Sequence, residues 1–150
     1  MCTWSLDGKL LNKICAHHGA AIWSIDVSDD NKIIFTGGAD GAVHAWPFVN
    51  DYIQKVILLP KAHIHTLSKY VCCLRSGNFL IFNENGTLFI FNNYYKSLLG
   101  SLYLEKYSTY CIMKVSLCRT YVCFASRDGY ITIYKGKLMI AKYWRNYINY

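Results

Sequence analysis

The stretch Thr36-Gly37-Gly38-Ala39-Asp40-Gly41, followed by Ala42-Val43-His44-Ala45-Trp46, decides how this chain folds. Asp-Gly is one of the dipeptides that two-residue hairpin turns prefer, because both central residues of such a turn adopt a positive φ angle. A short apolar run leads into this turn, and an alternation of apolar side chains leaves it and ends on an aromatic residue. The stretch therefore predicts a β-hairpin.

Two further stretches, residues 79–91 and 121–134, repeat the same pattern. The turn glycines are Gly41, Gly86 and Gly129. They are spaced by 45 and 43 residues, and an aromatic residue follows each of them five positions later. Trp4 lies 42 residues before Trp46 and is interpreted as the end of a fourth unit. The chain is therefore built from repeats.

Further alternating runs flank each predicted hairpin. A run precedes each hairpin, at residues 22–27, 70–74 and 111–117, and a looser run follows the first two, at 52–59 and 97–104. The chain shows no amphipathic helical pattern of convincing length. Four strands in a period of roughly 40–45 residues are the signature of a β-propeller blade.

We therefore predict an all-β fold, a partial β-propeller of about three four-stranded blades with the end of a preceding blade. The predicted boundaries are 1–16 for the end of a blade, 17–60, 61–103 and 104–143 for the three blades, and 144–150 for a tail. The alternative is an unrelated β-sandwich whose hairpins are evenly spaced.

The composition describes a globular chain. Its 150 residues allow one domain or part of one, and 53% hydrophobic and 17% charged residues exclude intrinsic disorder. No apolar run approaches the roughly 18 residues that span a bilayer. The start of the chain has neither a basic nor an apolar segment of a secretion signal. We predict a cytoplasmic protein without a membrane partner.

The cysteine pattern agrees with a reducing compartment. Seven cysteines are an odd number, and no pair has the C-x-x-C spacing of a zinc or redox site. Asn85-Gly86-Thr87 matches a glycosylation sequon, but the same residues make a good hairpin turn. We interpret this segment as a turn.

These features resemble the WD-repeat family. In that family a His, a Ser or Thr of the second strand, the turn Asp and a Trp of the third strand form a hydrogen-bonded tetrad. Carried over by position, the resemblance implies that the tetrad here is His18, Thr36, Asp40 and Trp46. A buried carboxylate, imidazole and indole each need hydrogen-bond partners, so such a cluster is physically reasonable.

The sequence departs from the family pattern in several places. His17 stands where the family has Gly before the His, and Pro47 stands where it has Asp after the Trp. The middle unit keeps His63, Asn85 and Phe91, and the last unit keeps only Asp128 and Tyr134. Because Phe has no hydrogen-bond donor, apolar packing is expected to hold the middle unit together.

Residues 17–48 show a narrower resemblance, to the WD-repeat proteins that serve as the non-catalytic partner of the tRNA wobble-nucleotide 2′-O-methyltransferase. This resemblance implies a regulatory scaffold that binds the methyltransferase and tRNA, in a chain that is a fragment. The alternative is a general protein–protein interaction scaffold with no RNA partner. Propellers bind through loops that vary freely, so the sequence does not identify the binding surface.

Charge favours the later half of the chain for contacts with RNA. The net charge is +7, and residues 76–150 carry nine basic and three acidic side chains. The candidate phosphate contacts are Lys114, Arg119, Lys142 and Arg145. Basic and aromatic residues interleave over 142–147, as in proteins that bind single-stranded nucleic acid. The alternative interpretation is a last blade strand with its charges facing outward.

Three patterns that could carry chemistry are rejected. Gly37-Gly38-x-x-Gly41 lacks the following helix that a phosphate-binding loop needs. His63 and His65 lack a third metal ligand at a recognisable spacing. Cys15 has histidines nearby in sequence, but nothing would orient a catalytic base. We therefore predict no catalytic residue, no cofactor, no metal and no small-molecule substrate.

Overall fold

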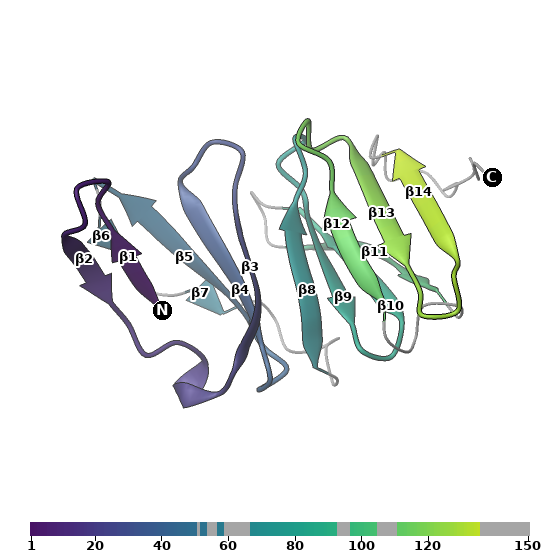
Figure 1. The fold of residues 1–150 in the computed structure, drawn as a ribbon, viewed down its shortest axis with the longest axis horizontal. Helices are drawn as coiled ribbons and strands as arrows, with labels where there is room; N and C mark the ends of the chain where they lie inside the picture. Colours follow the sequence, from purple (N-terminus) through teal and green to yellow (C-terminus); the bar gives the residue numbers. More distant parts are fainter. Residues whose placement is uncertain (51, 54–56, 59–66, 93–96, 105–110, 136–150) are drawn as a thin grey trace.

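The computed structural model describes residues 1–50, 52–53, 57–58, 67–92, 97–104 and 111–135. Within these ranges the chain forms four antiparallel β-sheets. The sheets follow one another in sequence order, from the purple N-terminal end to the yellow strand β14 (Figure 1). None of the described residues belongs to a helix long and apolar enough to cross a membrane.

Each sheet is an antiparallel meander in which strands adjacent in sequence pair, except that β7 pairs with β5. The first sheet contains β1 (Cys2–Trp4) and β2 (Leu10–Lys13). The second contains β3 (Ile22–Val27), β4 (Ile33–Gly38), β5 (Val43–Val49), β6 (Tyr52–Ile53) and β7 (Ile57–Leu58), the last two both paired with β5. The third contains β8 (Ser68–Cys73), β9 (Phe79–Asn83), β10 (Thr87–Phe91) and β11 (Leu98–Tyr103). The fourth contains β12 (Ile112–Val115), β13 (Tyr121–Ala125) and β14 (Ile131–Lys135).

The core consists of apolar layers between successive sheets. The layer between the second and third sheets contains Phe35, Val43, Ala45, Val71, Cys73, Phe79, Ile81, Phe89 and Phe91. The layer between the third and fourth contains Cys72, Leu74, Leu80, Phe82, Leu88, Ile90, Met113, Val122, Phe124 and Tyr134, together with Leu104 and Cys111. A smaller layer of Ala16, Ile34 and Trp46 lies on the other side of the second sheet.

Strand β9 shows why the sequence folds this way. Successive side chains of a strand point to opposite faces, so Phe79 and Ile81 enter one layer while Leu80 and Phe82 enter the other. Every residue of β9 is buried because a sheet covers each face. A strand enclosed on both sides reads as a continuous apolar run, as this one does.

The predicted all-β fold, a partial propeller of stacked sheets, is confirmed. The runs 22–27 and 121–125 are strands, as the alternation predicted. The blade boundaries at 60 and 103 stay predictions, and the tail at 144–150 lies outside the described residues.

Candidate functional site

A partly buried chain of hydrogen bonds lies beside the turn between β4 and β5. The His17 ring contacts the Asp40 carboxylate through Nδ1, at 2.8 Å from Oδ1, and the Thr36 hydroxyl through Nε2, at 2.8 Å. The Trp46 indole N–H donates to the same hydroxyl at 2.9 Å. His17 and Thr36 are essentially inaccessible to solvent. These four residues form what we call the histidine cluster.

The hydrogen bonds of the histidine cluster fit one assignment of donors and acceptors. An indole nitrogen can only donate, so Trp46 occupies a lone pair of Thr36 Oγ1. In this assignment the Thr36 hydroxyl donates to His17 Nε2, and His17 Nδ1 carries a proton that it donates to Asp40. A neutral imidazole protonated at Nδ1 satisfies every member of the cluster.

Asp40 also shapes the hairpin turn. Its Oδ1 accepts a hydrogen bond from the Ala42 backbone N–H at 3.0 Å. Burial raises the pKa of Asp40, but the hydrogen bonds from His17 and Ala42 outweigh it, so the pKa lies below its ordinary value. The carboxylate therefore stays ionised and holds both the turn and the imidazole.

The structure brings Thr36, Asp40 and Trp46 together as predicted, but the histidine is His17 and not His18. Residues His17, His18 and Gly19 all adopt positive φ angles in the short 3-10 segment η1 (His17–Gly19). This left-handed path sends the His18 side chain into solvent, while His17 is buried. The assignment of His18 was therefore wrong by one residue.

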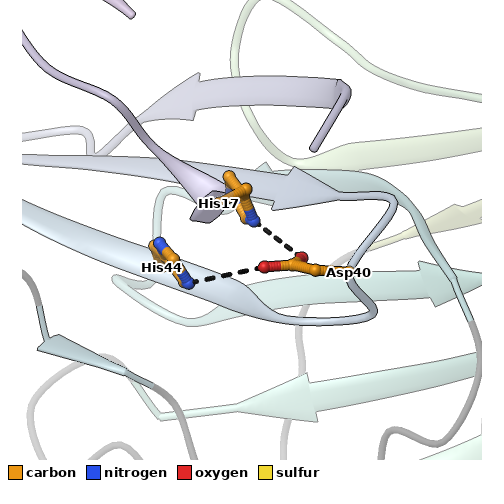
Figure 2. A group of neighbouring side chains, drawn as sticks. All are labelled: His17, Asp40 and His44. Atoms are coloured by element: carbon orange, nitrogen blue, oxygen red, sulfur yellow. Dashed lines mark hydrogen bonds and ion pairs between the residues drawn. The ribbon is translucent and has the colours of Figure 1, made fainter. Parts of the chain in front are cut away.

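His44, which the sequence analysis did not single out, lies against this cluster. Its ring stacks on that of His17 with centroids 4.0 Å apart and planes 9° from parallel. Its Nε2 lies 4.0 Å from the second carboxylate oxygen of Asp40. Figure 2 draws the three side chains His17, Asp40 and His44 together. The alternation of β5 toward the aromatic Trp46 was visible in the sequence, but the stacking of two imidazoles was not.

His17, Asp40 and His44 bring their ligand atoms within 4.8 Å of one another, which raises the question of a metal site. A histidine binds a metal along the lone pair in its ring plane, so two histidines sharing an ion must tilt toward it. These two rings are almost parallel and stacked, so their lone pairs do not converge. The arrangement fits a structural carboxylate–imidazole cluster and not a metal centre.

Of the four candidate phosphate contacts, the structure describes Lys114 and Arg119. Lys114 is exposed on β12, but Arg119 is committed to other side chains. Lys142 and Arg145 lie outside the described residues, as do His63 and His65. Arg119 as a contact for RNA phosphate stays a prediction, and its guanidinium already bonds protein partners.

Arg119 links three sheets. Its guanidinium donates to both carboxylate oxygens of Asp26 on β3 at 3.3 Å and to the Cys73 carbonyl at the end of β8 at 3.2 Å. Its Nε lies 3.7 Å from Asp29, and its own carbonyl accepts from the Arg75 N–H at 3.1 Å. Arg119 lies 93 residues from Asp26 in sequence, so no local pattern could have revealed the contact.

We expect Arg119→Gln to destabilise the fold by about 1–2 kcal/mol, because hydrogen bonds to charged groups are worth more than neutral ones. Asp26 would keep its bond from the Cys73 N–H, at 2.6 Å, but lose its cation. Urea unfolding followed by circular dichroism measures the loss. Lys114→Gln, an exposed change on the same sheet, is the control. If both variants were equally stable, that result would contradict the role of Arg119 in linking the sheets.

Asp40 also predicts how acid weakens the fold. A carboxylate whose pKa is lowered by folding stabilises the native state above its unfolded pKa, and that stabilisation is lost as pH falls through the folded pKa. The loss is therefore expected below the ordinary value of 3.8. Unfolding free energies measured from about pH 5 to about pH 2 should fall more steeply for the native chain than for Asp40→Asn. Identical pH slopes for the native chain and the variant would contradict the assignment of this loss of stability to Asp40.

Among the described residues of the third sheet, Ile81 and Phe91 stand where the second sheet has Thr36 and Trp46. Asn85 holds its turn by accepting from the Thr87 N–H at 3.0 Å, as Asp40 does in the second sheet. Phe91, at the position of Trp46, stacks on Phe79 with ring centroids 5.2 Å apart. At the Trp46 position of this sheet an aromatic stack therefore takes the place of the indole hydrogen bond, and His63 lies outside the described residues.

Comparison with known proteins agrees with this architecture. Residues 2–47 match the family model described as WD domain, G-beta repeat. Eukaryotic translation initiation factor 3 subunit I from Aspergillus niger is 44% identical over 59 residues, which are 39% of this chain and 17% of that protein. WD repeat-containing protein 3 from Mus musculus is 50% identical over 42 residues, 28% of this chain and 4% of that protein. The chain therefore spans less than a fifth of either relative.

Solved structures show the same fold. The C-terminal WD40 domain of Sif2 aligns with a TM-score of 0.67 at 20% identity, covering 90% of this chain and 37% of that one. A chain of the mitotic checkpoint complex aligns with a TM-score of 0.66 at 13% identity, covering 95% and 44%. The described residues thus form part of a WD40-type propeller. The comparisons support the WD-repeat resemblance but not the narrower one drawn from residues 17–48, which was to WD repeat-containing protein 6.

Proposed function

We propose that this chain is part of a non-catalytic scaffold that binds other proteins. The observation that carries this proposal is the WD40-type fold together with a polar cluster whose groups are taken up by structural hydrogen bonds. An imidazole bonded on both nitrogens has no lone pair left for a substrate. WD40 propellers serve generally as platforms for protein partners. Among the described residues, the hydrogen bonds of the histidine cluster hold the fold together.

The surface that best fits this role is the groove along the inner strands β3, β8 and β12. It has a volume of about 300 Å³ and includes Ser24, Tyr70, Lys114 and Leu117. Leu117 is fully exposed at the rim of the groove. An exposed apolar side chain beside hydroxyl groups and a cation is a common composition of protein interaction surfaces.

The test is partner recovery with matched surface variants. Proteins that copurify with the tagged chain from nuclease-treated extract should be lost with the double variant Lys114→Glu and Leu117→Asp. They should be kept with Arg127→Glu, an exposed change outside the groove. Thermal unfolding of each variant shows that folding is unchanged. Partners that bind the groove variant as well as the native chain would overturn the proposed surface.

A regulatory role in tRNA wobble 2′-O-methylation is a narrower form of the same proposal. The basic later half of the chain supports it, although the guanidinium of Arg119, one of the four candidate contacts, also bonds Asp26. Binding of purified tRNA that weakens steeply with salt and with Lys114→Glu would favour this form. Binding that is absent or insensitive to salt would favour a protein-binding scaffold with no RNA partner. The cytoplasmic location stays a prediction, which a fluorescent fusion tests.

A further inference from the structure

The inner backbone edge of strand β8 is satisfied by side chains of the preceding sheet. The Ser24 hydroxyl accepts from the Val71 N–H at 3.0 Å and donates to the Val71 carbonyl at 3.3 Å. The Asp26 carboxylate accepts from the Cys73 N–H at 2.6 Å. A hydroxyl and a carboxylate that stand two residues apart on β3 therefore cap the edge of β8.

The next pair of sheets carries different side chains at the same positions. Tyr70 stands in the third sheet where Ser24 stands in the second, because the cross-strand partner of each lies four residues before a turn glycine. Cys72 stands where Asp26 stands, with partners six residues before the glycine. Tyr70 and Cys72 belong to the apolar layer against the fourth sheet. Neither the short hydroxyl side chain nor the carboxylate is repeated there.

The inner backbone edge of β12 is consequently open. The Ser116 N–H donates to the Tyr121 carbonyl at 2.9 Å, and hydrogen-bonded pairs alternate with non-hydrogen-bonded pairs along an antiparallel ladder. The N–H groups of Met113 and Val115 therefore point away from β13, to the side where β12 has no paired strand within the described ranges. No residue that the structure describes accepts a hydrogen bond from either group. By register they correspond to the two capped N–H groups of β8.

The groove described under the proposed function runs along this open edge. Met113 and Val115 both line it. β12 also approaches β8 less closely than β3 does, which leaves room for an added segment. The described charged residues of the lining are Asp26, Lys114 and Arg119, and the first and last bond each other. Lys114 therefore leaves the groove with a positive charge beside two backbone donors, and this combination favours a carboxylate.

We propose that the groove binds an extended segment of a partner protein that carries a Ser-x-Asp motif. The Ser hydroxyl bonds the Met113 N–H and carbonyl. The Asp carboxylate accepts from the Val115 N–H, and Lys114 supplies the complementary charge. Side chains two residues apart lie on one face of a strand, roughly 6.6 Å from each other, which matches the spacing of the two N–H groups. This inference rests on the proposed scaffold function and adds the chemistry of the bound segment.

A synthetic peptide of residues 21–27, which contains Ser24-Ile25-Asp26, is the probe. We expect a fluorescently labelled form to bind the full chain saturably, as measured by anisotropy. The matched control peptide carries Ser24→Ala and Asp26→Asn. It should bind at least about tenfold more weakly, because it loses a hydrogen bond to a charged acceptor. Equal affinity of the two peptides, or no saturable binding up to about 1 mM, would overturn the proposal.

Hydrogen exchange locates the bound peptide. In the free chain, the N–H groups of Val71 and Cys73 should exchange slowly, and those of Met113 and Val115 should exchange rapidly. The peptide should slow the exchange of the second pair at least about tenfold. Saturable binding that leaves the exchange of Met113 and Val115 unchanged would place the peptide elsewhere and refute the site.

Val115→Pro removes the N–H that the ladder of β12 does not use, and an edge strand tolerates proline at such a position. Val115→Ala keeps this N–H and is the matched control. We expect Val115→Pro to bind the peptide at least about tenfold more weakly than Val115→Ala. Thermal unfolding checks that both variants fold. Should Val115→Pro not fold, the two peptides and the exchange measurement still decide.

The two proposals fail in different ways. Partners that are lost with the double variant Lys114→Glu and Leu117→Asp but bind both Val115 variants equally would overturn the Ser-x-Asp motif and leave the scaffold function standing. Motif-dependent peptide binding without any partner recovered from extract would support the motif and count against the scaffold function.

Discussion

Replacing His17 by asparagine is expected to destabilise the fold by about 2–4 kcal/mol. The imidazole is 1% exposed, and its two nitrogens bond Asp40 and Thr36. Its ring also stacks on His44. The shorter amide cannot bridge both partners, so a buried hydroxyl and a partly buried carboxylate would lose hydrogen bonds, and a gap would open beside His44.

His18→Asn is the matched control. Both histidines adopt left-handed backbone angles, φ 54° and 51°, which asparagine tolerates well, so the two substitutions differ in side-chain surroundings alone. The exposed His18 should change the free energy of unfolding by no more than about 0.5 kcal/mol. Urea titrations of the two variants measure the difference. A larger loss at His18 would restore the assignment made from sequence.

Repeated patterns made the fold predictable. Turn glycines at a near-constant spacing define the hairpins, and alternation of apolar residues defines which side of each strand is buried. Phe79, Leu80, Ile81 and Phe82 could be predicted as buried because a strand between two sheets has no solvent face. Repeat architecture depends on contacts between neighbouring units, so local sequence contains most of the information.

The candidate site was less predictable because it depends on exact backbone geometry. The backbone conformation of η1 decides whether His17 or His18 reaches Asp40. The spacing of residues in the sequence does not show that η1 is left-handed. The stack of His44 on His17 joins two segments through side-chain packing alone. Arg119 meets Asp26 across 93 residues because the sheets curve together, which periodicity does not describe.

Gly38→Ala is expected to be among the most damaging single substitutions, with a loss of about 3 kcal/mol or more. Gly38 ends β4 without a positive φ angle, so its role is spatial and not conformational. A Cβ at this position would lie 2.7 Å from Cγ and 2.9 Å from Cε1 of the His17 ring, and in contact with Nδ1 as well. These separations are far below van der Waals contact.

The His17 ring cannot retreat from an added methyl group without breaking its own bonds. Asp40 and Thr36 hold it on two sides, and His44 stacks against its face. The substitution therefore destabilises the fold in two ways, through overpacking and through the loss of hydrogen bonds. Gly100→Ala on β11 is the control, since nothing lies within 4 Å of its added Cβ, and it should change stability by less than about 0.5 kcal/mol. Similar midpoints for both variants in urea would mean that the ring is free to move, and that the histidine cluster does not hold the second sheet together.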